Sequence, residues 1–411
     1  MTDYFDAAER WDPEERESAL MAKLPGQVAL AQAKAPGFST ILAGVDAAGI
    51  TGRAALAQLP VTHKSDLSNL QRAETPFGGL NATPTSALRR VFMSPGPIAD
   101  PQGQGKDWFR MGRAIFAAGF RAGELIHNCF SYHFTPAGAM FEDGAHAVGC
   151  TVFPAGVGQT DLQVEAIAHF RPDGYAGTPD FLKLILDKAD ATGVDVSSIK
   201  RACVGGGALF PAMRDDYAAR GIHVRQSYGS ADCGLIAYES DAMEGMILDE
   251  HIILEIVRPG TGDPVMDGEV GEVLVTLINP DYPLIRFATG DLSAMMAGIS
   301  PCGRTAPRIK GWMGRADQTA KIRGMFVHPG QIDRVVKAVA GLNRARLTID
   351  HRGGRDTAVL RCEAEDTASA LADRIASAFI AECKVRATVE FVKAGELPND
   401  GKIIDDIRKY D

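Results

Sequence analysis

The sequence lacks any long apolar segment: nowhere do 18 uncharged apolar residues follow one another. A transmembrane helix needs about 20 predominantly apolar residues, so we expect no membrane-spanning segment. The opening stretch MTDYFDAAERWDPEERES is acidic and amphipathic, whereas a secretory signal peptide is first cationic and then apolar. These absences predict a cytoplasmic protein with no membrane partner.

The sequence also lacks a dense block of lysine and arginine interleaved with aromatic residues. Its 43 basic residues are outnumbered by 52 acidic ones, which gives a formal net charge of −9. A surface that follows a nucleic-acid backbone needs clustered positive charge. We therefore expect no nucleic-acid partner.

Cysteines are few and scattered, and no CxxC pair occurs among the seven. An odd, dispersed set argues against a disulfide framework and against a zinc knuckle, so we expect reduced thiols. Four of them lie in apolar runs, where a buried and inert thiol is the commoner outcome. These are Cys129, Cys150, Cys203 and Cys362.

What is present is enough chain for more than one core: 411 residues, 45% of them hydrophobic. Apolar residues at i, i+3 and i+4 predict helices over 13–34, 109–121, 161–171 and 179–191. Short apolar runs between Gly or Pro predict strands at 150–156, 174–179 and 201–207. Such alternation is typical of a mostly parallel sheet covered by helices.

The pattern changes after residue 245. The segments 247–257 and 272–278 read as paired strands, which predicts a smaller antiparallel unit. The last 95 or so residues have a βαββαβ-like order, which predicts a small two-layer α+β domain. Between them lies GWMGRADQTAKIRG, a charged stretch punctuated by glycine. We place a hinge at Asp317 and predict two domains, 1–316 and 317–411.

Four motifs then occur in order: YGSAD (228–232), PLIRFATGDL (283–292), GRADQTAKIRG (314–324) and ELPNDGK (396–402). Each is weak alone, but in this order and spacing they resemble the adenylate-forming acyl-CoA ligases. The stretches CGRTAPRI and FVHPGQID resemble the phenylacetate-CoA ligase branch more narrowly. The resemblance implies an α/β fold: a large N-terminal domain of parallel and mixed sheets with a small β subdomain, and a small C-terminal α+β lid.

The resemblance assigns a nucleotide to the first three motifs. Asp291 would accept hydrogen bonds from both ribose hydroxyls, a role that suits an ionised carboxylate, and Arg315 would also reach the ribose. Asp232 would hold magnesium, although the family carries a glutamate there and aspartate is one methylene shorter. The adenine would lie against Tyr228 and a glycine turn whose backbone a flat base can approach. These cofactor-binding positions are Gly205, Gly206, Gly207, Tyr228, Gly229 and Ser230.

The last motif supplies the adenylation lysine, Lys402, which the small domain would deliver to the carboxylate and the α-phosphate. Without the motif, Lys402 would read as a solvated lysine, Asp291 as a turn residue and Arg315 as part of a linker. The implied reaction joins an organic acid to ATP as an acyl-adenylate and then to coenzyme A as a thioester. ATP/AMP, Mg²⁺ and coenzyme A are therefore the expected cofactors.

One motif departs from the family. Where relatives carry SSGTTGxP around the terminal phosphates, this chain reads MSPGPIADPQGQGK. Ser94 and Gly96 keep their register, but Pro95 and Pro97 remove amide donors from the place where an anion-binding nest is wanted. Either residues 103–106 supply a displaced loop with Lys106 as the phosphate charge, or the site no longer uses ATP efficiently.

The acid pocket is expected at 127–149, where Tyr132, His133 and Phe134 combine flat apolar surface with one titratable group. Such a lining suits an aryl or other medium-sized acid, although a histidine there is more often a packing residue. Some relatives hold a structural zinc near 240–302; here Cys302 stands alone, so we expect no such site. A nucleotide- or acyl-CoA-binding protein without turnover, and an adenylating enzyme with another acceptor, stay open. A homodimer is compatible with all three.

Overall fold

The computed structural model describes residues 4–316, 318, 320–327, 329–352, 355–364, 367–398 and 402–408. The chain divides into two compact units, Met1–Met313 and Gly314–Asp411, close to the predicted boundary after residue 316. The described helices include none that is both long and apolar enough to cross a bilayer. The α/β class expected for the chain is confirmed, and each unit is described below by itself.

The larger unit is built on a nine-stranded sheet with the order β14-β15-β10-β9-β8-β7-β6-β4-β5. Five strands are parallel: β4 Leu125–Asn128, β5 Thr151–Phe153, β6 Gly174–Gly177, β7 Arg201–Val204 and β8 His223–Ser230. Four extend it antiparallel: β9 Gly234–Tyr238, β10 Met246–Leu248, β14 Met295–Met296 and β15 Arg308–Ile309. The predicted strands at 150–156, 174–179 and 201–207 correspond to β5, β6 and β7.

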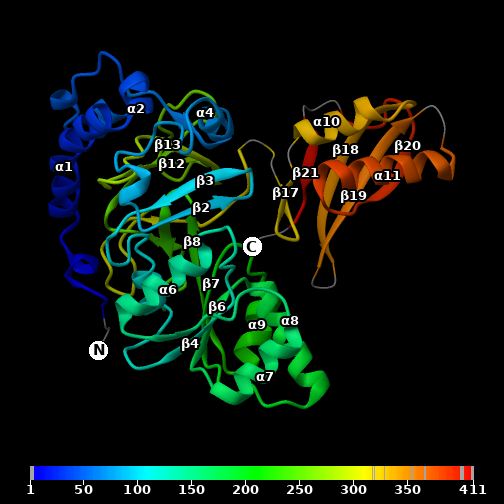
Figure 1. The fold of residues 1–411 in the computed structure, drawn as a ribbon, viewed down its shortest axis with the longest axis horizontal. Coiled ribbons are helices and arrows are strands. Elements are labelled where there is room, and N and C mark those ends of the chain that lie inside the picture. The colour runs from blue at the N-terminus through cyan, green and yellow to red at the C-terminus, as the bar shows by residue number, and fades with distance from the viewer. Residues whose placement is uncertain are drawn as a thin grey trace. The chain divides into compact units, whose positions relative to one another are not determined.

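Helices cover both faces of the parallel strands (Figure 1). On one face pack α5 Gly112–Ala117 and α6 Ala137–Val148, and on the other α7 Thr160–Phe170, α8 Pro179–Thr192 and α9 Pro211–Ala219. The predictions for α7 and α8 are confirmed. The helix predicted over 109–121 is shorter, because Arg110 has a left-handed φ of 64° and the Asp107 carboxylate accepts the Gly112 N–H at 2.9 Å where α5 begins.

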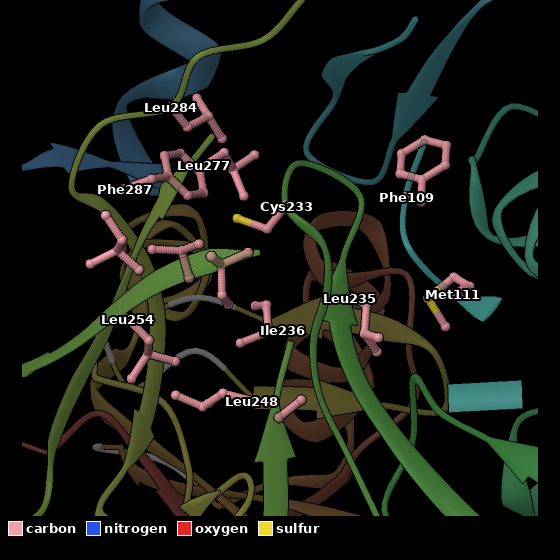
Figure 2. Close-up of a cluster of buried hydrophobic side chains, with 14 of the residues drawn as sticks. Phe109, Met111, Cys233, Leu235, Ile236, Leu248, Leu254, Leu277, Leu284 and Phe287 are labelled. Atoms are coloured by element: carbon pink, nitrogen blue, oxygen red, sulfur yellow. The ribbon is translucent and has the colours of Figure 1, made fainter. Parts of the chain in front are cut away.

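A second sheet, ordered β1-β13-β12-β11, carries the predicted antiparallel unit. It consists of β1 Thr62–His63, β11 Ile252–Val257, β12 Gly271–Leu277 and β13 Phe287–Ser293. Its apolar side shares a buried core with β9 and β10 (Figure 2), in which Leu254, Leu277 and Phe287 lie near Leu235 and Ile236. The two sheets are therefore fixed to each other by hydrophobic contact.

The N-terminal segment covers this core with α1 Pro13–Lys34, α2 Pro36–Ile41, α3 Arg53–Leu56 and α4 Leu67–Ala73. Short 3₁₀ turns are η1 Ala7–Arg10, η2 Ala47–Gly49, η3 Lys64–Asp66 and η4 Thr85–Ala87. The helix predicted at 13–34 is confirmed as α1, whose first turn is capped by Asp12, since its carboxylate accepts the Glu14 and Glu15 N–H groups at 2.9 and 3.2 Å. A hairpin, β2 Arg90–Ser94 and β3 Ile98–Gln102, follows.

The smaller unit is the predicted α+β domain. A sheet ordered β20-β19-β18-β21 packs against two helices through a core that includes Ile332, Leu347, Leu360 and Phe379. Its elements are β16 Ala320–Ile322, β17 Met325–Val327, α10 Pro329–Ala338, β18 Leu342–Arg352, β19 Arg355–Ala364, α11 Ser369–Cys383, β20 Thr388–Val392 and β21 Ile404–Asp406.

All seven cysteines of the chain are buried free thiols, as expected for the four in apolar runs.

Arg286, in the PLIRF motif, fastens β13 to the N-terminal segment. Its fully buried guanidinium donates to the carbonyl oxygens of Ala57, Leu59 and Gly262 at 2.9, 2.6 and 2.6 Å, and it forms an ion pair with Glu255 at 3.1 Å. Removing one partner of such a buried pair leaves a charge and several carbonyls unpaired. The arginine of this motif is therefore structural.

We expect Arg286→Met to lower the free energy of unfolding by about 3–5 kcal/mol, because Glu255 and three carbonyls lose their donor. Urea denaturation followed by circular dichroism measures it. Arg171→Met, which breaks an exposed pair with Asp195 at 3.2 Å, is the matched control and should cost less than about 1 kcal/mol. Equal costs for the two variants would contradict this role for Arg286.

Candidate functional site

The candidate nucleotide site begins at the carboxyl ends of β7 and β8. The two strands are parallel, with Val204 opposite Gln226, so the turn at Gly205–Gly207 and the end of β8 meet at one edge of the sheet. A side chain at Gly205 would meet the Ser227 hydroxyl at 2.8 Å, which explains a residue without one. Crevices at this edge of parallel sheets are where α/β proteins bind ligands.

Asp291, on β13, lies against β8. The Tyr228 hydroxyl donates to Asp291 Oδ2 at 2.8 Å, and Trp312 Nε1 donates to Oδ1 at 3.0 Å. Burial and then the charge of Asp291 hold the pKa of Tyr228 well above its usual range, so the phenol stays a donor. Two motifs 63 positions apart are thus brought into direct contact.

Asp232 lies in the turn between β8 and β9 and is almost wholly buried. Ser230 shapes this turn, because its hydroxyl accepts the Cys233 N–H at 3.1 Å, and Gly229 lets the Gly234 carbonyl approach closely. Asp232 Oδ2 forms an ion pair with Lys64 Nζ. Burial alone would lower the pKa of Lys64, but the charge of Asp232 raises it above its ordinary value.

Lys64 reaches this place from a distant part of the chain. It follows β1, in which His63 pairs with Ala288 of β13, and so it lies beside the strand that carries Asp291. Sequence reasoning missed Lys64, and its only signal was its position in the stretch VTHKSDL. The pairing of β1 with β13 therefore adds a cation to the candidate site.

Two further buried side chains interact electrostatically with the Lys64–Asp232 pair. Asp100, on β3, is fully buried, and burial raises its pKa to about 8, an effect that the charge of Asp232 reinforces. Tyr282 is also fully buried, and burial, followed by the charges of Asp232 and Asp100, keeps its pKa well above the usual range. Neither residue, nor Trp312, was identified from the sequence.

The divergent loop is the turn of the β2–β3 hairpin. Ser94 pairs with Ile98, so Pro95, Gly96 and Pro97 make the whole turn and Gly96 carries its single backbone N–H. The Ser94 hydroxyl donates to the Ile98 carbonyl at 3.4 Å. The turn offers few donors to a chain of phosphates.

Lys106 is not brought to this turn. Arg90 pairs with Gln102 at the opposite end of the hairpin, about 13 Å from Ile98 at the usual rise of a strand. Residues 104–106 follow there and are exposed. The displaced loop with Lys106 as a phosphate ligand stays a prediction; in this conformation strand pairing places Lys106 away from Ser94 and Gly96.

The three predicted pocket residues are separated. The Tyr132 hydroxyl accepts from Asn128 at 2.8 Å, and its ring lies over Gly138, where a Cβ would come within 2.8 Å of it. His133 is exposed, and Phe134 is 76% exposed with a left-handed φ of 62°. Tyr132 is half-buried, and the other two face solvent.

The remaining predicted residues belong to the smaller unit. Lys402 precedes β21, is 55% exposed and lies 3.5 Å from Asp405. Asp405 also pairs with Arg346 at 3.0 Å, so it keeps a cation if Lys402 moves. Arg315 is half-buried, and Asp317, the predicted hinge, lies outside the described residues.

Comparison with known proteins gives the family. The sequence matches the AMP-binding enzyme family over residues 114–277 and the AMP-binding enzyme C-terminal domain over 324–406. A phenylacetate-coenzyme A ligase of Thermus thermophilus is 31% identical over 373 residues, covering 86% of this chain and 83% of that protein. One of Aromatoleum evansii is 32% identical over 336 residues, covering 78% and 74%.

The fold is shared with a solved structure of 2-hydroxyisobutyryl-CoA ligase in complex with 2-HIB-AMP and CoA. The TM-score is 0.83 at 24% identity, and the match covers 98% of this chain and 92% of the other. At that identity the match establishes the fold, while the curated relatives establish the family. This chain belongs to the phenylacetate-coenzyme A ligase family of AMP-binding enzymes.

Proposed function

We propose that this protein is an AMP-forming acid–CoA ligase, which activates an aryl or other medium-sized carboxylic acid with ATP and transfers the acyl group to coenzyme A. The observation that carries the proposal is the carboxylate of Asp291, which two neutral donors hold at the ligand-binding edge of the sheet. A carboxylate with two accepting oxygens matches the adjacent hydroxyls of a ribose. The names of the curated relatives support the same reaction.

In this proposal the nucleotide replaces the contacts that Asp291 makes in its absence. The ribose hydroxyls would donate to Asp291, assisted by Arg315, and Tyr228 would be released to face the adenine. The turn at Gly205–Gly207 would border the other side of the base, since its backbone carries no Cβ to obstruct a flat ring.

Asp232 fits the role of a magnesium ligand. Its Oδ1 is buried without a hydrogen-bond partner among the described residues, and carboxylate oxygen is a ligand that magnesium prefers. Magnesium, when bound, supplies positive charge to the phosphate oxygens. Lys64, paired with Oδ2, keeps a second positive charge beside them.

The first step joins a carboxylate oxygen of the acid to the α-phosphorus of ATP and breaks the bond from that phosphorus to the leaving pyrophosphate. Lys402 would stabilise the negative charge that accumulates on the α-phosphate. In the second step the thiol sulfur of coenzyme A, after losing its proton, forms a bond to the acyl carbon and AMP leaves. The acid would lie beside Tyr132, with His133 and Phe134 as further candidates for its contacts.

The β2–β3 turn favours a second candidate, a nucleotide- or acyl-CoA-binding protein without turnover. Because the turn has a single amide donor, it holds the terminal phosphates of ATP less firmly than a loop rich in serine, threonine and glycine. Asp291, Asp232 and Lys402 together favour the enzyme, since a protein that only binds has no need of an adenylation lysine.

The discriminating experiment is ATP–pyrophosphate exchange across a panel of aryl and aliphatic acids, with magnesium present. We expect exchange that depends on the acid, followed by thioester formation when coenzyme A is added. Hydroxylamine in place of coenzyme A separates a ligase from an enzyme with another acceptor. Thermal stabilisation by AMP or coenzyme A without exchange for any acid would overturn the enzyme and favour the binding protein.

A further inference from the structure

The segment that precedes Lys402 is fastened to the sheet of the smaller unit. The Arg344 guanidinium, on β18, donates to the carbonyl oxygens of Leu397 and Pro398 at 2.9 and 2.6 Å. The Glu363 carboxylate, on β19, accepts the Leu397 N–H at 2.8 Å. Two adjacent strands therefore hold the chain on the N-terminal side of the lysine.

The residue that follows Lys402 is held from two sides. The Ile403 carbonyl accepts the Leu347 N–H at 3.0 Å, next to the place where β21 pairs with β18. The Ile403 N–H donates to Gln318 Oε1, also at 3.0 Å. The first bond belongs to the sheet, whereas the second comes from a side chain 85 positions earlier in the chain.

Gln318 has an unusual place and an unusual backbone. It directly follows Asp317, the predicted hinge, and it is half-buried. Its φ of 57° lies in the left-handed region, which residues other than glycine adopt uncommonly. Such a conformation persists where surrounding contacts fix it, and it often marks a functional position. The hydrogen bond to Ile403 is one contact that fixes Gln318.

We propose that Gln318 is a positioning residue for the adenylation step: its carboxamide holds the backbone next to Lys402, so the lysine moves together with the first residues after the hinge. The inference rests on the proposed function, in which Lys402 stabilises charge on the α-phosphate. A long lysine side chain has many rotamers, and fixing its backbone reduces the freedom that must be lost when the ammonium meets the phosphate. Gln318 touches no reacting atom and acts through Lys402.

The test measures the two steps separately, as ATP–pyrophosphate exchange and as thioester formation from synthetic acyl-adenylate and coenzyme A. Gln318→Met keeps the size of the side chain and removes the acceptor. It should lower the exchange rate by about threefold to tenfold, the worth of one neutral hydrogen bond, and leave thioester formation at the wild-type rate. Gln318→Glu retains an acceptor oxygen and should keep most of the exchange rate.

A matched glutamine gives the control. The Gln331 amide donates to the Glu382 carbonyl at 2.8 Å elsewhere in the same unit. Gln331→Met therefore also removes one hydrogen bond between a side chain and the backbone, but none beside Lys402. We expect both steps to keep their wild-type rates in this variant. An equal loss of exchange in Gln331→Met and Gln318→Met would overturn the inference.

A combination with Lys402→Ala separates positioning from general damage. In that background Gln318→Met should lower exchange no further, because the side chain that Gln318 positions is absent. A further loss of the same size, or an unchanged exchange rate in Gln318→Met alone, would overturn the inference and leave the proposed function standing. Absence of acid-dependent exchange in the wild type would refute the proposed function itself, and this inference with it.

Discussion

Replacing Asp291 by asparagine should weaken the binding of AMP by on the order of a hundredfold, because two hydrogen bonds to a charged acceptor are worth about 3 kcal/mol together. Isothermal titration calorimetry measures the loss. The fold should survive, since the asparagine oxygen still accepts from Trp312 and its amide can donate to the Tyr228 hydroxyl, now in contact with Asp291 at 2.8 Å.

The ligand supplies the control for this variant. If Asp291 accepts from the ribose, 2′-deoxy-AMP and 3′-deoxy-AMP should each bind less tightly than AMP to the wild type. Asp291→Asn should discriminate much less between the three, because the missing hydroxyl has lost its charged acceptor in every case. An undiminished preference for AMP in the variant would place the ribose contact elsewhere.

Substituting Lys402 by alanine should lower the rate of acid-dependent ATP–pyrophosphate exchange by about a hundredfold to a thousandfold. Removing one preorganised donor to a developing negative charge lowers a rate by roughly this factor. Radiolabelled pyrophosphate incorporation measures the rate. The Lys402 side chain is 55% exposed and its pair with Asp405 is 3.5 Å long, and exposed pairs of this kind contribute little to stability.

Two comparisons give this result its meaning. Lys393→Ala, which removes another exposed lysine of the smaller unit, should leave the exchange rate unchanged. Synthetic acyl-adenylate supplied with coenzyme A should still form thioester in Lys402→Ala, because Lys402 is assigned to the first step alone. Loss of both steps would refute that assignment and point to a structural role.

A helix or strand could be predicted from the sequence where its start and stop signals lie within or next to the element itself. The helix at 13–34 has the boundaries of α1, since Asp12, Pro13 and the acidic first turn are all start signals that can be read in sequence. The order of strands and helices from 150 to 207 likewise matched the parallel sheet, whereas α9 was not predicted. The motifs placed Tyr228 and Asp291 in one site, and the fold brings them into contact.

The missed residues depend on pairings that no local pattern contains. Lys64 reaches Asp232, 168 positions away, because β1 adds in parallel to the edge of β13. Asp100 reads as a surface residue in a proline-rich stretch, and it becomes buried only when the hairpin closes with Ser94 opposite Ile98. The same closure explains why Lys106 is carried away from the turn.

The most direct test of the account is a crystal structure of the protein with a non-hydrolysable acyl-adenylate analogue. We predict that both ribose hydroxyls donate to the Asp291 carboxylate, that Tyr228 has left Asp291 to face the adenine, and that the acyl chain lies beside Tyr132. Adenosine bound at another place, with the Tyr228–Asp291 hydrogen bond intact, would contradict it.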